Sequence, residues 1–438
     1  MDELAMLGGH RSVPRSRRVL RWPHVTEEEE QAVSRVLASG RFTVASAGEA
    51  EVTGLEREWA DFVGTAYCIA VDNGTAALSL ALAAAGVQPG DEVIVPALSF
   101  IASGLAPLHI GAVPVFVDID PDTFNATAET IENAITGRTR AIVVVHLHGL
   151  PVDLDQILAL AERRGLLVLE DAAQAQGARY RDRVVGSFGV INSFSLNVAK
   201  NLPTCGEGGL INTDDPELYR RAAMLRQFGE TLGGSEERSY VSHLPGWNHK
   251  PNAIQCAFTR AQLGRFETTA KIRGANVERL LATLRELPGL QVPTCPADRS
   301  HAWHILRFRL SPEAFGLAPR QAGALRAVVM KALRAEGVPA THYQLMPLPM
   351  QRAFSGHVSD AGRAAFPHSY QVIEDSFTIQ KAHLHPEAGP LLESYAEAFG
   401  KVWRHRALLA SYAAASDDVP PWEEANRLAD AEAAELSR

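Results

Sequence analysis

Between residues 53 and 214, the hydrophobic and polar positions follow two alternating patterns. Short, almost continuously apolar runs rich in β-branched residues alternate with longer runs in which apolar residues recur at helical spacing. The first pattern is typical of strands in a sheet covered on both faces, and the second is typical of helices. This alternation predicts an α/β fold with a mostly parallel sheet between helices. The predicted strands are 91–97, 112–120, 140–149, 166–171, 190–196 and 208–214, and the predicted helices are 75–86 and 153–165.

After about residue 266 the pattern changes to that of a smaller α+β domain packed on the first. Helices are predicted over 268–287, 321–337 and 393–412, with a strand over 302–310. The N-terminal segment has no apolar signal core and is expected to be disordered, and the C-terminal end has little apolar surface to pack. The expected division is an N-terminal arm (1–24), a large domain (25–266), a small domain (267–415) and a peripheral tail (416–438).

Composition limits the possible partners of this chain. Its 438 residues are 46% hydrophobic and 21% charged, as in an ordinary globular protein. The net charge of -9 provides no basic face, which disfavours nucleic acid and anionic membranes as partners. No apolar run is long enough to span a membrane. The four dispersed cysteines, without a CxxC pair, suit a reducing compartment, so a cytoplasmic protein without structural zinc is expected.

A glycine-rich turn carries the strongest chemical signal. Lys200 follows Ser195 by five residues, precedes the run GEGG and stands 29 residues after Asp171. An enzyme that uses pyridoxal 5'-phosphate (PLP) needs an amine to form an imine with the cofactor and a carboxylate to keep the pyridine nitrogen protonated. The Ser195 hydroxyl can bond the cofactor phosphate from the same turn. Taken alone, Lys200 would more often be a solvated surface residue, but its neighbours favour a cofactor site.

Three further segments supply candidates for the same site. Asp171 ends a predicted strand, at the edge where open α/β sheets bind ligands, although it could also cap the next segment. Gln174 could bond the ring hydroxyl of the cofactor or be a plain surface residue. Gly74 and Thr75, which follow the possible cap Asn73, open a predicted helix whose N–H groups can bind phosphate. Phe100, after a strand, could stack on the ring or belong to the core.

Histidines mark possible substrate contacts. His146 stands at the end of the predicted strand 140–149 and could carry a proton or face the substrate, while a structural role is equally expected. His148 stands two residues further on, but no third ligand is near, so no metal is expected. The segment THYQLMPLP, with His342 and Tyr343, is a further candidate for the substrate pocket.

Together these segments resemble those of the DegT/StrS-type sugar aminotransferases, PLP-dependent enzymes with the fold of aspartate aminotransferase (fold type I). The resemblance covers nearly the whole chain and follows the order of the family. The matching segments are WPHVTEEEEQAVSRVLASG, NGT, PGDEVIVPALSF, GAVPVFVDID, VVHLHG, LEDAAQAQGA, SFSLNVAKNLPTCGEGGLINTDD and GWNHKPNAIQCAFTRAQL.

The resemblance implies a role for each cofactor residue. Lys200 would form the Schiff base and carry the proton of the 1,3-shift, and Asp171 would pair with the pyridine nitrogen. Gln174 would bond the ring hydroxyl and Phe100 would stack on the ring. The phosphate would be held by Gly74, Thr75 and Ser195.

The resemblance also implies a homodimer with shared active sites, in which Asn248 reaches a phosphate across the interface. The chain departs from the family here. Lys250 and Pro251 stand where Arg and Met are usual, and Ala253 stands where an acid is usual. Because Lys does not replace Arg in a bidentate contact, the usual contacts of this segment are in doubt.

The expected activity is transfer of an amino group from glutamate or glutamine to a ketone on a sugar, cyclitol or related carbocycle in antibiotic or other secondary metabolism. TCGEGG and the WP opening look closest to the branch acting on cyclitols and carbocycles, with nucleotide-linked keto-sugars nearly as favoured. A PLP-dependent dehydratase or eliminase and a non-catalytic regulator or partner subunit are the alternatives. Lys200, in place of the histidine of the family's dehydratases, favours transamination.

Overall fold

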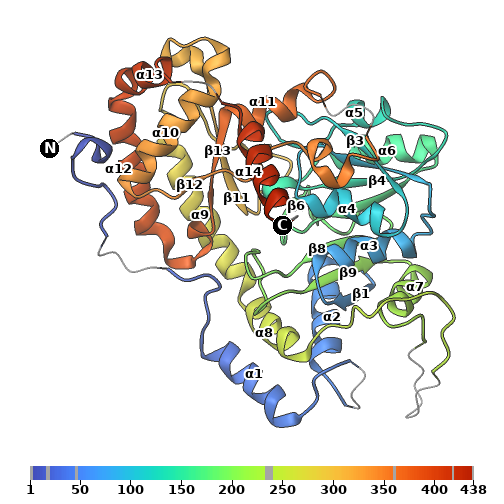
Figure 1. The fold of residues 1–438 in the computed structure, drawn as a ribbon. Coiled ribbons are helices and arrows are strands. Elements are labelled where there is room, and N and C mark those ends of the chain that lie inside the picture. Colours follow the sequence, from blue (N-terminus) through green and yellow to red (C-terminus); the bar gives the residue numbers. More distant parts are fainter. Residues whose placement is uncertain are drawn as a thin grey trace.

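A computed structural model describes residues 3–15, 20–44, 48–231, 240–358, 362–416 and 419–436 (Figure 1). Its large sheet has seven strands: β1 (Tyr67–Val71), β2 (Glu92–Pro96), β3 (Val113–Val117), β4 (Thr139–Val145), β5 (Leu167–Asp171), β8 (Asn192–Ser195) and β9 (Gly209–Thr213). The order is β1-β9-β8-β5-β4-β2-β3, and β9 alone runs antiparallel to its neighbours. This confirms the predicted α/β fold with a mostly parallel sheet.

Helices cover both faces of this sheet, as the near-continuous apolar strands require. They are α1 (Glu27–Ser39), α2 (Glu51–Val63), α3 (Gly74–Ala84), α4 (Ile101–His109), α5 (Ala128–Glu132), α6 (Leu154–Arg164), α7 (Pro216–Arg226) and α8 (Ala253–Gly264). Alternate residues of β4 face opposite cores. Ile142 and Val144 join the core beneath α2, α6 and α8, whereas Ala141, Val143 and Val145 join the core beneath α3, α4 and α7.

The small domain is built on a four-stranded antiparallel sheet in the order β10-β11-β13-β12. Its strands are β10 (Leu290–Gln291), β11 (Ile305–Leu310), β12 (Ala340–Thr341) and β13 (Ser376–Gln380), and its helices are α9 (Phe266–Leu284), α10 (Ala322–Glu336), α11 (Pro367–Asp375), α12 (Gly389–Arg404) and α13 (Arg406–Ala414). A short hairpin, β6 (Arg179–Tyr180) and β7 (Arg183–Val184), belongs to the large domain.

The predicted last helix over 393–412 is two helices. The backbone leaves the helical region at His405, which ends α12 and begins α13. The break places Leu409 and Ala413 in the core of the small domain, where both are fully buried. The two cores also do not separate cleanly along the chain, because Leu348, Phe354 and other residues of 346–373 pack in the large-domain core.

The N-terminal segment was expected to be disordered, and the described part of it is not. Leu4 and Val13 are buried in the core of the small domain. The Glu336 carboxylate accepts hydrogen bonds from the backbone N–H groups of Ala5 (2.8 Å) and Ser12 (2.9 Å). These contacts join segments more than 300 residues apart, which local sequence patterns do not reveal. Residues 1–2 and 16–19 of the predicted arm lie outside the described residues.

The predicted tail contains a helix, α14 (Pro421–Leu436), that packs against α11 and residues 346–373, at the edge of the large-domain core. Trp422 meets the ring of Tyr370 edge-on, with 4.8 Å between the centroids, and Asp430 pairs with Arg352. Residues 417–418 and 437–438 lie outside the described residues. Among the helices that the structure describes, none combines the length and apolar character needed to cross a lipid bilayer.

Candidate active site

A cavity of about 690 Å³ lies between the carboxyl ends of the parallel strands and the small domain. The structure brings most of the predicted site residues together there. The lining includes Gly74, Thr75, Phe100, Asp171, Gln174, Ser195, Lys200 and Tyr343. They come from separate segments, and they meet because the ends of parallel strands share one edge of the sheet.

Lys200 is held in a tight turn after β8. Its backbone N–H donates to the Asn197 carbonyl at 2.8 Å, and its own carbonyl accepts a hydrogen bond from Trp22 Nε1 at 3.1 Å. Burial disfavours the charged ammonium and lowers the pKa of Lys200 to about 8, while the charge of Asp171 acts in the opposite direction. The amine is therefore partly neutral near physiological pH, which suits a nucleophile and a general base.

Asp171 presents a fixed carboxylate at the end of β5. It is 8% exposed, and its two oxygens accept hydrogen bonds from Ser103 Oγ (2.8 Å) and from the Ala173 backbone N–H (3.1 Å). Ser103 in turn contacts Ser99 Oγ at 2.8 Å. These two hydrogen bonds fix the orientation of the Asp171 side chain. The carboxylate can therefore bind a protonated ring nitrogen within the cavity.

Gln174 has one defined amide orientation. The His148 backbone N–H donates to Gln174 Oε1 at 2.8 Å, which identifies this end of the amide as the oxygen. Its Nε2 donates to the Tyr343 hydroxyl at 2.9 Å. The amide nitrogen has two protons, which leaves one for an acceptor in the cavity such as a ring oxygen of the cofactor.

The start of α3 forms a close-fitting anion cradle beside Ser195. Asn73 caps this helix, because its Oδ1 accepts the Ala76 backbone N–H at 2.8 Å. The first N–H groups of a helix lack partners within it and attract anions. A Cβ at Gly74 would lie 2.6 Å from the Ser195 Cβ, so only glycine brings the backbone this near to the hydroxyl.

We expect Gly74→Ala to weaken PLP binding by about 5- to 150-fold, because overpacking at such a contact costs about 1–3 kcal/mol. The dissociation constant of PLP, titrated into cofactor-free protein, measures this. Gly137→Ala is the matched control, since a Cβ there meets nothing within 4 Å. Equal PLP affinity in both variants would place the phosphate elsewhere.

Phe100 and Tyr343 supply aromatic surface to the cavity. Phe100 is 53% exposed, which is unusual for a phenylalanine and leaves a ring face open to a planar ligand. Burial raises the pKa of Tyr343, so its hydroxyl stays protonated. His342, predicted beside Tyr343, is not among the residues that line the cavity.

The structure does not bring His146 into the cavity. Its side chain is fully buried, its Nε2 lies 2.9 Å from Glu170 Oε2, and its Nδ1 accepts the Val152 backbone N–H at 3.2 Å. Both ring nitrogens are therefore committed to structural bonds. Proximity to a strand end suggested a catalytic position, but the ring points toward Glu170 within the protein, so we leave His146 out of the candidate site.

Asn248 lies on an exposed segment outside the cavity of its own chain. Lys250 Nζ donates to its Oδ1, and the same ammonium lies 4.2 Å from the centroid of the Phe228 ring. The Lys250 ammonium thus contacts Asn248 and Phe228 of its own chain. A single ammonium cannot make the bidentate contact that an arginine at this position would make. The role of Asn248 across a dimer interface stays a prediction.

Several cavity residues had no signal in the sequence. These are His304, Gln380 and Lys381. Glu207, which also lines the cavity, belongs to the run GEGG, and Trp22, which holds the carbonyl of Lys200 from outside the cavity, belongs to the WP opening. His304 directly precedes β11 and Gln380 is the last residue of β13, so both lie far along the chain from Lys200. Only the packing of the two domains brings them to the site.

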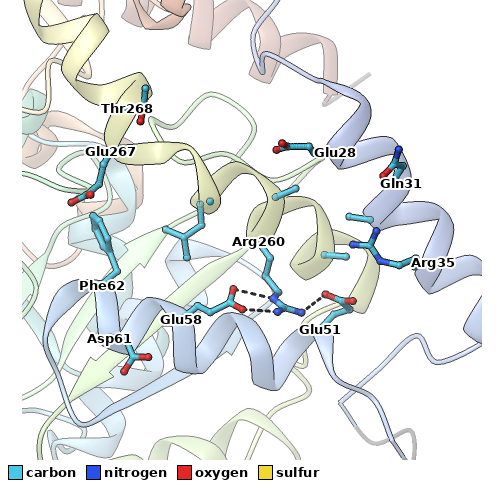
Figure 2. Close-up of a pocket in the computed structure, with 15 residues that line it drawn as sticks. Glu28, Gln31, Arg35, Glu51, Glu58, Asp61, Phe62, Arg260, Glu267 and Thr268 are labelled. Carbon is cyan, nitrogen blue, oxygen red and sulfur yellow. Dashed lines mark hydrogen bonds and ion pairs between the residues drawn. The ribbon is translucent and has the colours of Figure 1, made fainter.

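A second, more open hollow of about 880 Å³ lies between α1, α2, α8 and α9 (Figure 2). Its central Arg260 is bound by Glu58 (2.5 and 3.0 Å) and Glu51 (2.6 Å), as Figure 2 shows. Those hydrogen bonds raise the pKa of Arg260 and fix its charge. This cluster ties α2 to α8 and contains none of the predicted catalytic residues.

The donor set of the first cavity fits PLP. It offers an amine of lowered pKa, a fixed carboxylate, an open aromatic ring and a cradle for phosphate. Within the ranges that the structure describes, no group of three or more His, Cys, Asp or Glu side chains is placed to hold a metal ion.

Shielded histidines should make stability depend on pH. Burial lowers the pKa of His301 to about 3 and that of His342 and His383 to about 4, from an ordinary 6.5. Above pH 6.5 both folded and unfolded chains keep these rings neutral. Below it the unfolded chain binds protons that the folded chain does not, so the free energy of unfolding should fall from pH 6.5 to about 4.

Urea unfolding at pH 7.5, 6.0 and 5.0 checks this expectation. His383→Gln should flatten the pH dependence, because it removes one of the groups. An unfolding free energy that stays constant from pH 7.5 to 5.0 would contradict it.

Comparisons with known proteins identify relatives of this chain. Residues 23–388 match the DegT/DnrJ/EryC1/StrS aminotransferase family. The L-glutamine:2-deoxy-scyllo-inosose aminotransferase of Streptomyces fradiae is 36% identical over 438 residues, covering 94% of this chain and 100% of the relative. The dTDP-3-amino-3,4,6-trideoxy-alpha-D-glucose transaminase of Streptomyces venezuelae is 36% identical, covering 76% and 82%. A solved aminotransferase from Psychrobacter cryohalolentis is similar with a TM-score of 0.80 and 31% identity, covering 89% and 99%.

Both named activities of these relatives are transaminations. This supports the predicted aminotransferase over the dehydratase and regulator alternatives.

Proposed function

Because this chain belongs to the DegT/DnrJ/EryC1/StrS aminotransferase family and is a PLP-dependent aminotransferase, we propose that it transfers the α-amino group of glutamine to a ketone on a cyclitol. The observation that carries the proposal is the match to the L-glutamine:2-deoxy-scyllo-inosose aminotransferase, which extends over the full length of that relative. The keto-sugar transaminase matches a smaller share of both chains. A nucleotide-linked keto-sugar is therefore the second candidate for the acceptor.

Lys200 has two tasks in this proposal. Bound PLP supplies an aldehyde carbon that takes up amines and a ring that withdraws electrons from the carbon attached to the nitrogen. Lys200 Nζ would hold the cofactor, and as a free amine it would take and return a proton. Its pKa of about 8 allows both, because the neutral form is available without extreme alkalinity.

The other cavity residues bind and orient. The Asp171 carboxylate, fixed by Ser103, would keep the ring nitrogen protonated, and Gln174, which already donates one N–H to Tyr343, would donate the other to the ring hydroxyl. Phe100, which lines the cavity, would stack on one face of the ring. The start of α3, with Gly74 and Thr75, would hold the phosphate together with Ser195, so that the ligand would be fixed at both ends. Tyr343 and the other small-domain residues face the substrate side.

We also propose a homodimer in which Asn248 of one chain completes the phosphate site of the other. Its exposed position outside its own cavity supports this arrangement. We further propose that the enzyme is cytoplasmic and acts in antibiotic or other secondary metabolism, in which ketones on cyclitols and sugars are aminated.

Isotope transfer tests the proposed donor and acceptor together. The purified protein with PLP is incubated with scyllo-inosose or 2-deoxy-scyllo-inosose and with glutamine that carries ¹⁵N at either the α-amino or the amide position. Mass spectrometry should find ¹⁵N in the aminocyclitol only with α-labelled glutamine. A dehydrated product without nitrogen would support the elimination alternative. The absence of any product from either ketone would exclude these acceptors, and the same assay with a nucleotide-linked keto-sugar then tests the second candidate.

A further inference from the structure

His304 is a cavity residue for which the cofactor site provides no task. It lies immediately before β11, on the small-domain wall of the cavity, and is 7% exposed. Its backbone N–H donates to the His148 carbonyl at 2.9 Å, which fixes the position of the ring's attachment. The protonation of its two ring nitrogens determines whether the ring donates or accepts a hydrogen bond in the cavity.

The neighbouring Asn201 determines where the imidazole proton lies. Asn201 Nδ2 donates to the Ala302 carbonyl at 2.7 Å, and Asn201 Oδ1 lies 3.0 Å from His304 Nδ1. A carbonyl can only accept, so the NH₂ group must face Ala302 and the amide oxygen must face His304. An amide oxygen also only accepts. The proton of the imidazole must therefore be on Nδ1.

The surroundings keep this ring neutral. Burial lowers the pKa of His304 well below its ordinary value, and the charge of Lys200 acts in the same direction. The other ionisable groups that act on it, His148, His383 and Arg273, also disfavour a second proton. With Nδ1 protonated and the ring neutral, Nε2 carries a lone pair and can only accept a hydrogen bond.

We propose that His304 Nε2 accepts a hydrogen bond from a hydroxyl group of a polyhydroxylated cyclic ketone, which makes His304 a binding residue for the amino acceptor. This inference rests on the proposed function and specifies how its site recognises the substrate. Nδ1 is turned to Asn201, which does not line the cavity, so Nε2 is the nitrogen available to a ligand.

Because Nε2 can only accept a hydrogen bond, it favours the ketone over glutamine as its partner. An acceptor-only nitrogen binds O–H groups, and a cyclitol carries such groups on its ring carbons. The α-carboxylate of glutamine has only acceptor oxygens and would be repelled by the lone pair. His304 should therefore act mainly in the half-reaction of the ketone.

His304→Phe tests this, because it keeps a planar ring and removes the acceptor. The KM for scyllo-inosose should rise about tenfold relative to the KM for glutamine, the value of one hydrogen bond. A series of analogues that each lack one hydroxyl, including 2-deoxy-scyllo-inosose, should contain one member for which the variant shows no penalty. The dissociation constant of each corresponding amine product, measured by calorimetry, should follow the same order without turnover.

His357→Phe, on an exposed turn away from the cavity, is the control for replacing a histidine by phenylalanine. An equal penalty on every analogue, or a greater loss with glutamine than with the ketone, would overturn the proposal. Failure of the unmodified protein to aminate any ketone in the series would instead contradict the proposed function.

The protonation state can be read without relying on the folding of a variant. ¹⁵N NMR of histidine-labelled wild-type protein, with His304 assigned by its contact to Asn201, should show a neutral ring protonated on Nδ1 at pH 7. A proton on Nε2, or a charged ring at that pH, would overturn the inference.

Discussion

Replacing Lys200 with alanine should reduce transamination by at least about 10³-fold, since it removes both the covalent hold on the cofactor and the group that moves the proton. The variant should still fold, because the turn is fixed by backbone contacts that alanine keeps, including the hydrogen bond from Trp22 to the carbonyl of residue 200. The measurement is kcat for amination of the ketone, with bound PLP measured separately after gel filtration.

Two controls isolate the effect of the amine at position 200. Lys271→Ala, an exposed lysine on α9, should behave as the unmodified protein does. A small primary amine added to the Lys200→Ala variant should restore part of the rate, because it can replace the missing base within the cavity. Full activity of Lys200→Ala without added amine would remove the core of the mechanism.

Replacing Asp171 with asparagine should leave PLP bound but slow the reaction by about 10²- to 10³-fold, the usual cost of losing one fixed electrostatic contact to developing charge. Asparagine has nearly the same shape, so the contacts with Ser103 and Ala173 can be retained in part. Without the negative charge the ring nitrogen loses its proton. Single-turnover rates with glutamine measure the effect on the first half-reaction.

Ser103→Ala provides a graded comparison. It removes one hydrogen bond to the carboxylate and leaves the charge, so a loss of about tenfold or less is expected. If Asp171→Asn turned over at a near-normal rate, another group would have to hold the proton on the ring. If Ser103→Ala were as impaired as Asp171→Asn, orientation would matter more than charge.

The strand-end residues could be predicted because their positions follow from local patterns. A parallel sheet places the carboxyl ends of its strands at one edge, so Asp171 and Ser195 were expected near each other, and the turn with Lys200 follows directly. The same rule placed His146 at that edge as well. It did not reveal that the ring turns toward Glu170, because a residue just beyond a strand has no fixed side-chain direction.

Contacts between distant segments could not be predicted. The order of the N-terminal segment depends on Leu4 and Val13 reaching the core of a domain formed some 300 residues later. The position of His304 depends on the docking of β11 against the Lys200 turn through Asn201. Neither contact leaves a periodic signal in the chain, since each involves a few residues of ordinary composition.

The central claim is that the Lys200 cavity moves an amino group from glutamine to a cyclic ketone. An absorbance spectrum of the purified protein with PLP tests it most directly. Adding glutamine should remove the long-wavelength band of the bound cofactor, and adding scyllo-inosose or 2-deoxy-scyllo-inosose should restore it. A band that glutamine leaves unchanged, although PLP is bound, would contradict the account.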